Sequence, residues 1–233
     1  MFKKILVNKE RKLYWKTGDV HSKDGIIKEK ELKKTKVKTN KKVEFKVLPA
    51  NLLDNLEKIK RGPAIVIKKD IGSILANTDL DKNSIVLEAG SGSGHLTISL
   101  SRYVKKVISY EKNKQFYDLT LKNLESLNIK NVKLENKDIY NGIKEKVDAI
   151  ILDLDQPWNV LTHTKTLKQG GYLVSYLPNI TQVKRLVNEA EKDYHIEKIS
   201  ETIEREWVID EKRARPKNMI IGHTAWLVFL RKL

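Results

Sequence analysis

Cysteine is absent from this 233-residue chain. Disulfide scaffolds, thiolate metal sites and cysteine nucleophiles are therefore excluded. No segment approaches the ~20 apolar residues that a membrane-spanning helix needs, and the first residues, MFKKILVNKERK, lack the apolar core of a signal peptide. We therefore expect a cytoplasmic protein with no membrane partner. Internal repeats and low-complexity segments are also missing, apart from a general richness in lysine.

Positive charge is what the chain has in excess. It contains 46 Lys and Arg residues against 30 Asp and Glu residues, which gives a formal net charge of +16. Residues 1–46 alone hold sixteen basic and six acidic residues, so most of the excess lies in the first fifth of the chain. A field of this sign attracts polyanions, most commonly nucleic acid, although a lysine-rich solvated surface would explain part of it.

The hydrophobic pattern divides the chain into three parts. Residues 1–49 contain short strands broken by turns, which indicates a small, basic N-terminal β domain. Leucines at helical spacing predict a linker helix over residues 50–62. From residue 63 to 233, strands alternate with helices, which predicts a Rossmann-like, doubly wound and mostly parallel α/β sheet. Two C-terminal segments, 195–210 and 223–233, predict long antiparallel strands that complete it.

A glycine-rich segment, LEAGSGSGHLT, follows the first strand of this sheet. Glycines at a strand-to-helix turn let the backbone approach a ligand, and the helix N-terminus presents free N–H groups to it. The dinucleotide fingerprint G-x-G-x-x-G needs a third glycine where this chain has His95, which disfavours a nicotinamide oxidoreductase. The form seen here, with Glu88 on the strand itself, is typical of class I S-adenosylmethionine methyltransferases.

Acidic residues also end the next two strands of the sheet. Glu111 follows VISY and Asp138 follows KLENK. An acid at the second strand end can hold ribose hydroxyls, and one at the third can accept a hydrogen bond from the adenine amino group. The carboxyl ends of parallel strands meet at one edge, where α/β proteins bind ligands. Single strand-end acids are common turn residues, but three in order behind a glycine loop favour a cationic nucleoside cofactor.

The fourth strand, in VDAIILDLDQPW, ends in Asp153. Burying a carboxylate without a partner is costly, so this strand tip must be solvated, paired or occupied by a ligand. We expect Asp153 to face a substrate nitrogen beside the cofactor. Pro157 would set the turn, and a helix is expected over residues 158–171.

These segments together resemble one family, the tRNA adenine-N1 methyltransferases that modify the T-loop adenosine. The resemblance is carried by LEAGSGSGHLT, ISYE, NKDIY, ILDLDQPW, SYLPNITQV and RARPKNMIIGHTAWLVFLRK. The N-terminal DVHSKDGIIKEKEL is similar to that family's small β domain. The resemblance implies methyl transfer from S-adenosyl-L-methionine to N1 of tRNA adenosine 58, with adenosine 57 left open as a second target. It also implies a homotetramer.

The resemblance further implies roles for individual residues. Asp153 and Tyr176 would be catalytic, with Tyr176 flanking the extruded base. Gln156, Arg215 and His223 are candidate substrate contacts, although such residues at turns and on basic surfaces are often only structural. No metal ligand is expected. The cofactor-binding residues would be Glu88, Gly90, Ser91, Gly92, Ser93, Gly94, His95, Leu96, Glu111, Asp138, Ile139 and Asp153.

One departure from the family pattern concerns the junction before Lys69. The family often has an aromatic residue and a proline where this chain has Ile67 and Lys68, so the base-stacking role of that aromatic is not assigned. Rival interpretations are a methyltransferase acting on ribosomal RNA, protein or a small molecule, and a non-catalytic tRNA-binding subunit. A non-catalytic subunit would be expected to lose the glycine loop and the strand-end acids.

Overall fold

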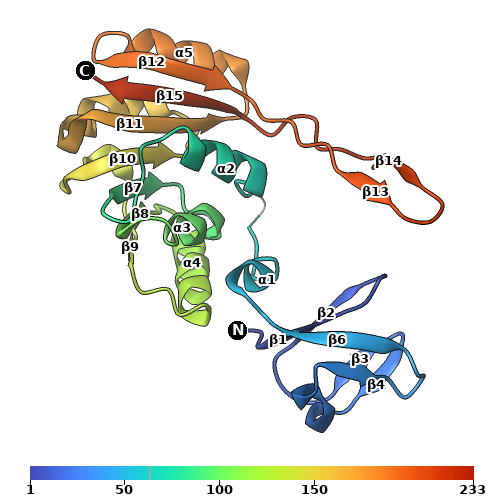
Figure 1. Ribbon diagram of the computed structural model, residues 1–233. Coiled ribbons are helices and arrows are strands. Elements are labelled where there is room, and N and C mark those ends of the chain that lie inside the picture. The colour runs from blue at the N-terminus through green and yellow to red at the C-terminus, as the bar shows by residue number, and fades with distance from the viewer. Residues whose placement is uncertain (63) are drawn as a thin grey trace. The chain divides into compact units, whose positions relative to one another are not determined.

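The computed structural model describes residues 1–62 and 64–233 (Figure 1). The predicted domain boundary at Pro63 therefore lies outside the described residues. The chain forms two compact units, residues 1–60 and residues 61–233. No helix in the described part of the chain is long and apolar enough to cross a membrane.

The first unit is a small antiparallel β structure. Four strands pair in the order β2-β1-β6-β5, and β3 and β4 form a separate hairpin. A 3-10 turn, η1 (Glu29–Lys33), leads into β5. The strands are β1 (Lys4–Val7), β2 (Lys12–Trp15), β3 (Val20–Ser22), β4 (Gly25–Ile27), β5 (Lys36–Lys38) and β6 (Glu44–Pro49).

Alternation along the strands builds the core of this unit. Phe45 and Val47 point inward from β6 and are almost completely buried, while Lys46 between them faces solvent. They pack with Leu6 of β1 and Val37 of β5 in one cluster, which Val43 joins from the edge. The predicted single apolar face of Val43, Phe45 and Val47 is therefore confirmed.

The helix that follows, α1 (Leu52–Leu56), is much shorter than predicted from the leucine spacing. A capping box between Asn51 and Asp54 starts it, because each side chain accepts the backbone N–H of the other residue. The Asn55 side chain then bonds to both backbone groups of Phe2. These tertiary contacts stabilise one helical turn, and a helix this short needs such support.

The second unit contains a seven-stranded sheet with the order β12-β15-β11-β10-β7-β8-β9. All neighbours are parallel except β15, which runs antiparallel to both β11 and β12. This confirms the predicted Rossmann-like fold with an antiparallel C-terminal strand. The strands are β7 (Ile85–Ala89), β8 (Lys106–Tyr110), β9 (Val132–Glu135), β10 (Val147–Leu152), β11 (Leu167–Leu177), β12 (Tyr194–Ser200) and β15 (Trp226–Lys232).

Both faces of this sheet are covered, as its two-sided burial requires. One face packs against α2 and α3 through residues such as Ile74 and Leu96, and the other against α5 and η3 through Leu186 and Val160. Figure 1 shows α2 and α5 on these opposite faces. The helices are α2 (Lys68–Ala76), α3 (His95–Leu100), α4 (Lys114–Ser126) and α5 (Ile180–Ala190), with 3-10 segments η2 (Ile139–Asn141) and η3 (Pro157–Thr166).

Two predicted elements of this unit were wrong in detail. The helix expected over 158–171 is a kinked 3-10 segment that ends at Thr166, because β11 already begins at Leu167 and pairs with Val147. The strand expected over 195–210 ends at Ser200, where its pairing with β15 stops. The chain then forms an arm, residues 201–225, that carries the short hairpin β13 (Trp207–Ile209) and β14 (Ala214–Pro216).

Core packing in the first unit gives a testable prediction. Leu6 is completely buried, whereas Leu48 on the neighbouring strand is 43% exposed. Replacing Leu6 with Ala should lower the opening free energy of the β1 and β6 amides by ~2–5 kcal/mol, because a cavity is left. Leu48→Ala, the matched control, should change it by no more than about 0.5 kcal/mol. Peptide-resolved hydrogen exchange measures both, and equal effects would contradict the assigned core.

Candidate active site

The glycine loop after β7 is shaped by one close approach between backbones. Asp153 N–H donates to the Ala89 carbonyl at 3.0 Å, which extends the β7–β10 pairing to the strand tips. Gly90 has φ +90°, and a Cβ there would lie 2.1 Å from the Asp153 carbonyl oxygen. Only glycine fits this position, for conformational and for steric reasons. The start of the glycine loop therefore packs directly against the backbone of Asp153, the residue expected to act on the substrate.

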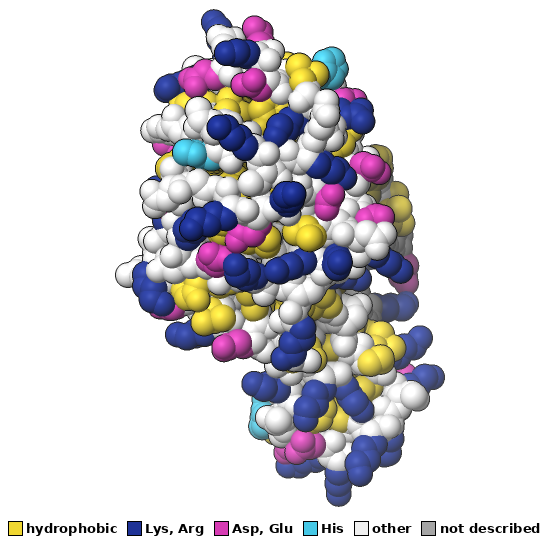
Figure 2. All heavy atoms as spheres, turned by 90° about the vertical axis from the view of Figure 1, so that its left-hand side faces the viewer, with side chains coloured by type: hydrophobic (Ala, Val, Ile, Leu, Met, Phe, Trp, Pro, Cys, Tyr) yellow, Lys and Arg dark blue, Asp and Glu magenta, His cyan; other side chains and the backbone are white. Residues whose placement is uncertain are grey.

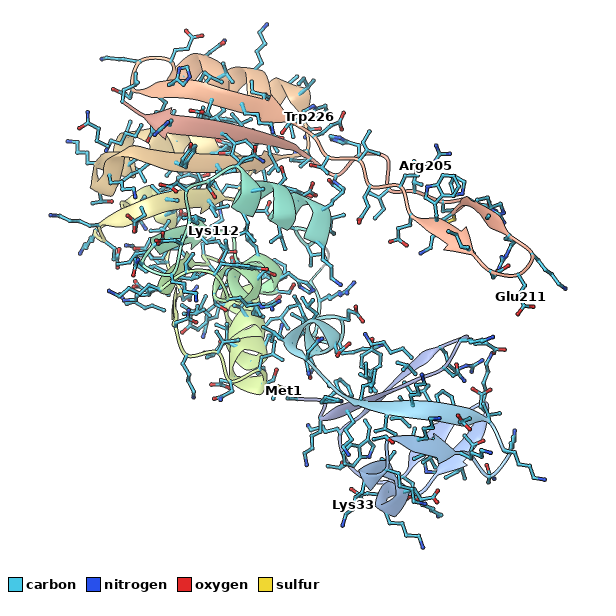
Figure 3. All side chains as sticks on the ribbon, in the orientation of Figure 1. Met1, Lys33, Lys112, Arg205, Glu211 and Trp226 are labelled. Carbon is cyan, nitrogen blue, oxygen red and sulfur yellow. The ribbon has the colours of Figure 1, made fainter. Side chains whose placement is uncertain are left out.

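A crevice of about 300 Å³ opens at the carboxyl edge of the sheet. This size falls within the usual range for small-molecule sites. Lys112 stands near this edge in Figure 3. The residues lining the crevice include four carboxylates, and the full set is Gly62, Ala64, Ala89, Gly90, Gly92, Tyr110, Glu111, Lys112, Phe116, Lys137, Asp138, Ile139, Tyr140, Asp153, Leu154 and Asp155.

Two of these carboxylates are held in fixed orientations by backbone amides. The Glu111 oxygens accept from Gly92 N–H at 3.0 Å and from Asn113 N–H at 2.9 Å. Asp138 caps the 3-10 turn η2 by accepting from Tyr140 N–H at 3.0 Å. The structure thus brings together the predicted second-strand and third-strand acids beside the glycine loop. It places them where a nucleoside could meet both.

Glu88 is close to the crevice but does not line it. It is completely buried, and its Oε2 accepts hydrogen bonds from the Thr97 hydroxyl at 2.6 Å and the Ser109 hydroxyl at 2.8 Å. Its Oε1 has no hydrogen-bond partner in the described part of the chain. Burial, assisted by the charges of Asp153 and Glu111, raises the pKa of Glu88 to about 7. Glu88 therefore links β7 to α3 and β8 and interacts with the crevice carboxylates Asp153 and Glu111 through charge.

Asp153 follows the last residue of β10 and lines the crevice. Burial first, and then the nearby Glu111 charge, raise its pKa to about 6. No hydrogen bond to its side-chain oxygens is found within residues 1–62 and 64–233. A carboxylate in this state can accept a new hydrogen bond from a ligand without losing an existing one.

Tyr176 stands beside Asp153 because β10 and β11 pair with Leu152 opposite Ser175. Burial raises the Tyr176 pKa, the charges of Asp70 and Asp153 add to the shift, and a hydrogen bond with Thr224 opposes it. Sequence reasoning missed Thr224 and Asp70 as parts of this site. The Lys-Asp pair of the junction was visible in the sequence, but nothing there linked it to Thr224, which lies 154 positions further along.

The remaining loop residues line a smaller hollow next to the crevice. Ser91, Ser93, His95 and Leu96 surround it, together with Gly90, Gly92 and Asp153. The Ser93 hydroxyl and His95 Nδ1 are 3.1 Å apart, and the Ser91 and Thr120 hydroxyls are 3.3 Å apart. Gly94 starts α3 with φ +83°. All residues of the predicted cofactor-binding segment 90–96 except Gly94 therefore line this hollow. Their role in cofactor binding stays a prediction.

The three candidate substrate contacts lie in different places. The Gln156 side chain accepts from Asn159, and the Gln156 carbonyl accepts from the Tyr140 hydroxyl, next to the crevice. Arg215 lies on β14 of the arm and bonds to Asn218 and to the Pro216 carbonyl within that hairpin. Arg215 does not line the crevice.

His223 is held at the base of the arm. Its Nδ1 is 2.8 Å from a Glu201 oxygen and its Nε2 is 3.1 Å from the Pro178 carbonyl, so two acceptors face the two ring nitrogens. The hydrogen bonds to Glu201 and Pro178 raise the His223 pKa. The ring also packs on Trp226, with centroids 4.1 Å apart, and Figure 3 labels Trp226 where β15 begins. His223 therefore connects the two ends of the arm, at Glu201 and before β15, to the residue that follows β11.

Ile67, at the position of the family's stacking aromatic, is the N-cap residue of α2 and is partly buried. It does not line the crevice. Metal-site geometry is also missing from the described residues, where no group of three or more His, Cys, Asp or Glu side chains could hold a metal ion.

Comparison with known proteins shows the family. Residues 57–222 match the family described as tRNA methyltransferase complex GCD14 subunit. The tRNA (adenine(57)-N(1)/adenine(58)-N(1))-methyltransferase TrmI of Methanocaldococcus jannaschii is 33% identical, over 98% of this chain and 94% of the relative. The tRNA (adenine(58)-N(1))-methyltransferase TrmI of Thermus thermophilus is 35% identical, over 84% of this chain and 80% of the relative.

Solved structures agree with the sequence comparison. The crystal structure of the tRNA (m1A58) methyltransferase TrmI of Aquifex aeolicus superposes with a TM-score of 0.87 at 30% identity, covering 99% of this chain and 96% of that one. A Thermotoga maritima structure described as an S-adenosylmethionine-dependent O-methyltransferase reaches 0.90 at 27% identity, covering 100% and 93%. The resemblance found in the sequence is thus confirmed, and this chain belongs to the TrmI-like family of tRNA (adenine-N(1))-methyltransferases.

Proposed function

We propose that this protein transfers a methyl group from S-adenosylmethionine to N1 of an adenosine in the T-loop of tRNA. The observation that carries the proposal is the position of Asp153. It lies beside the glycine loop, lines the crevice and keeps its carboxylate free of hydrogen bonds among the described residues. The tRNA substrate of the relatives supports the choice of target, with position 58 common to them and position 57 added in one.

The residues of the crevice fit the proposed cofactor. Glu111 is pre-oriented by two backbone amides and could hold the ribose, and Asp138 with Ile139 could hold the adenine. A Cβ at Gly92 would point into open space, so its absence widens the crevice at the loop. S-adenosylmethionine would supply an electrophilic methyl group next to a carboxylate-rich wall. The intact loop and acids argue against a non-catalytic subunit.

The chain's contribution to the reaction would be electrostatic. Adenine N1 has a free lone pair near neutral pH and needs no strong base to attack. Methylation leaves a positive charge that the ring shares with the exocyclic amino group. Asp153, accepting from that amino group, would stabilise the cationic transition state more than the neutral base, which is the condition for rate enhancement.

Replacing Asp153 with Ala should therefore lower the rate of methyl transfer to unmodified tRNA by ~10²–10³-fold. Cofactor binding should persist, because Glu111 and Asp138 remain. Asp118→Ala is the matched control, since Asp118 is an exposed carboxylate on α4 that pairs with Lys114. Labelled-cofactor incorporation and nucleoside mapping give the rate, and isothermal titration gives the affinity. A fully active Asp153→Ala variant would refute the assignment.

Cofactor affinity should depend on pH in a defined direction. Burial raises the pKa values of Glu88 and Asp153 to about 7 and about 6, so both carboxyls gain protons as the pH falls through that range. A bound cation favours their ionised forms, so the affinity should fall from pH 8 to pH 5 and binding should release protons. S-adenosylhomocysteine, which lacks the sulfonium charge, should show a smaller change.

Calorimetry in buffers of different ionisation enthalpy measures the protons released. Glu88→Gln removes the group with the higher pKa and should flatten the upper part of the pH curve. The same pH dependence for both ligands would contradict this link between carboxyl charge and cofactor charge.

The first unit is the proposed contact for tRNA phosphates. Residues 1–60 contain eighteen Lys and Arg and eight Asp and Glu, an excess of ten positive charges. Figure 2 shows Lys and Arg side chains over the visible face of this unit. Lys36 and Lys46 lie directly opposite each other on β5 and β6 and both are exposed. Like charges in this arrangement are destabilising unless a polyanion neutralises them.

A Lys36→Gln, Lys46→Gln variant tests that role through the salt dependence of tRNA binding. Each lost phosphate contact should reduce the slope of log K against log salt by about 0.7–0.9. Lys28→Gln is the control, because Lys28 is already paired with Asp19 at 2.8 Å. An unchanged slope in the double variant would exclude this face as a phosphate contact.

The arm supports the further proposal of a homo-oligomer, a tetramer by resemblance to the family. Apolar side chains that are at least half exposed gather on it, and a second copy of the chain would bury them. Figure 3 labels Arg205 and Glu211 on this arm, so charges of both signs accompany them. The apolar residues are Ile203, Trp207, Ile209, Met219, Ile220 and Ile221.

A further inference from the structure

The Asp153 carboxylate has no hydrogen bond of its own, among the described residues, that would fix its orientation. Its direction must therefore be set by the backbone on either side of it. On the N-terminal side, Asp153 N–H donates to the Ala89 carbonyl at 3.0 Å. On the C-terminal side, Leu154 packs against the core cluster, and residues 155 and 156 lead into η3. The contacts of residues 155 and 156 therefore complete the support of the carboxylate.

Gln182, in the first turn of α5, makes the first of these contacts. Its Nε2 donates to the Asp155 carbonyl at 2.8 Å and to Asp155 Oδ1 at 3.0 Å. Its Oε1 accepts from Asn179 N–H at 3.1 Å, at the start of the helix. Because Asp155 offers only acceptors and the Asn179 amide only a donor, the orientation of the Gln182 amide group is determined. One end of this side chain therefore caps α5, and the other holds the residue two positions after Asp153.

Tyr140 makes the second contact, from the opposite wall. It belongs to η2, lines the crevice, and donates its hydroxyl to the Gln156 carbonyl at 3.1 Å. Arg185, three residues after Gln182 on α5, places its guanidinium over the Trp158 ring, 4.2 Å from the ring centroid. The segment that follows Asp153 is therefore attached to two different elements, α5 and η2.

Stability alone gives little reason for these attachments. Asp155 and Gln156 are both exposed, so water could satisfy their carbonyls, and the net gain from each hydrogen bond is small. What the attachments do provide is order in the backbone next to a reacting group. A displacement of ~1 Å at such a group can lower a rate by ~10²-fold.

We propose that Gln182 and Tyr140 are positioning residues for methyl transfer, which act by holding the backbone after Asp153 and thereby the orientation of its carboxylate. A charge that is already oriented needs no rearrangement in the transition state, and this makes it effective. The inference rests on the proposed function and adds the residues that orient its catalytic group. It also gives a role to the glutamine of SYLPNITQV, which the local sequence leaves unexplained.

The variant Gln182→Glu separates the two ends of the side chain. The introduced carboxylate can still accept from Asn179 N–H, but it cannot donate to Asp155 and repels its carboxylate. The rate of a single turnover with saturating unmodified tRNA and S-adenosylmethionine at pH 8 should fall by ~10–100-fold. The dissociation constants of both ligands should stay within about twofold, since ground-state binding is not changed. A residue that only caps α5 would instead keep the full rate.

Asn188→Asp is the matched control, because it makes the same change from amide to acid at an exposed position of the same helix. Its turnover rate and both dissociation constants should equal those of the wild type. A loss of rate in this control as large as that in Gln182→Glu would assign the effect to charge on α5 and overturn the inference.

A cycle with Asp153→Ala tests whether Gln182 acts through Asp153. In the Asp153→Ala background no carboxylate is left to orient, so Gln182→Glu should lower the remaining rate by no more than about twofold. Tyr140→Phe removes the hydroxyl but keeps the ring, and should lower the wild-type rate by about tenfold, the size of one hydrogen bond. Its effect should also disappear in the Asp153→Ala background. Equal losses in both backgrounds would indicate a general effect on the fold and contradict the proposal.

The outcomes distinguish this inference from the function on which it rests. If the wild-type protein does not methylate adenosine in tRNA, or if Asp153→Ala is fully active, the proposed function is wrong and the inference with it. If both of those expectations hold but Gln182→Glu keeps the full rate, only the inference is overturned. A loss confined to tRNA affinity would make Gln182 a substrate contact and overturn it as well. Should Gln182→Glu not fold, Tyr140→Phe decides through the same cycle.

Discussion

The contact between Gly90 and the Asp153 carbonyl is the constraint on which the site depends. Parallel strands β7 and β10 are joined up to their tips, where Asp153 N–H reaches Ala89. This pairing therefore fixes the position of Asp153, the residue proposed to contact the base, relative to the glycine loop that is proposed to bind the cofactor. A side chain at position 90 would separate them, since its Cβ would lie 2.1 Å from the carbonyl oxygen.

The free-energy cost of placing several carboxylates close together is concentrated at the carboxyl edge of the sheet. Glu88, Glu111, Asp138 and Asp153 crowd a small region, and burial makes ionisation of Glu88 and Asp153 harder. Such a cluster is unfavourable in an isolated protein and becomes favourable beside a positive ligand. The chain as a whole is strongly basic, so the acidic crevice stands apart from a surface suited to a polyanion. The proposed cationic cofactor and the proposed anionic substrate would therefore use regions of opposite charge.

Much of this could be predicted from the sequence because the signals were local. The glycine loop, Glu111 and Asp153 each follow a short buried strand, Asp138 lies three residues after the partly exposed β9, and their meeting point follows from parallel pairing. Elements decided by distant partners could not be predicted in this way. The length of α1 depends on contacts of Asn55 with Phe2, and the arm begins where β12 loses its neighbour. The hydrogen bond from the Thr224 hydroxyl to Asp70 joins residues 154 positions apart, so no local pattern in the sequence indicates it.

The place of β15 in the sheet has a consequence for how the protein is made. This strand lies between β11 and β12, both of which precede it in the chain. During translation β12 has no neighbour in the sheet, and β11 has only β10, until residues 226–232 have left the ribosome. A nascent chain could therefore assemble the glycine loop early, yet would complete the outer edge of the sheet only among its final steps.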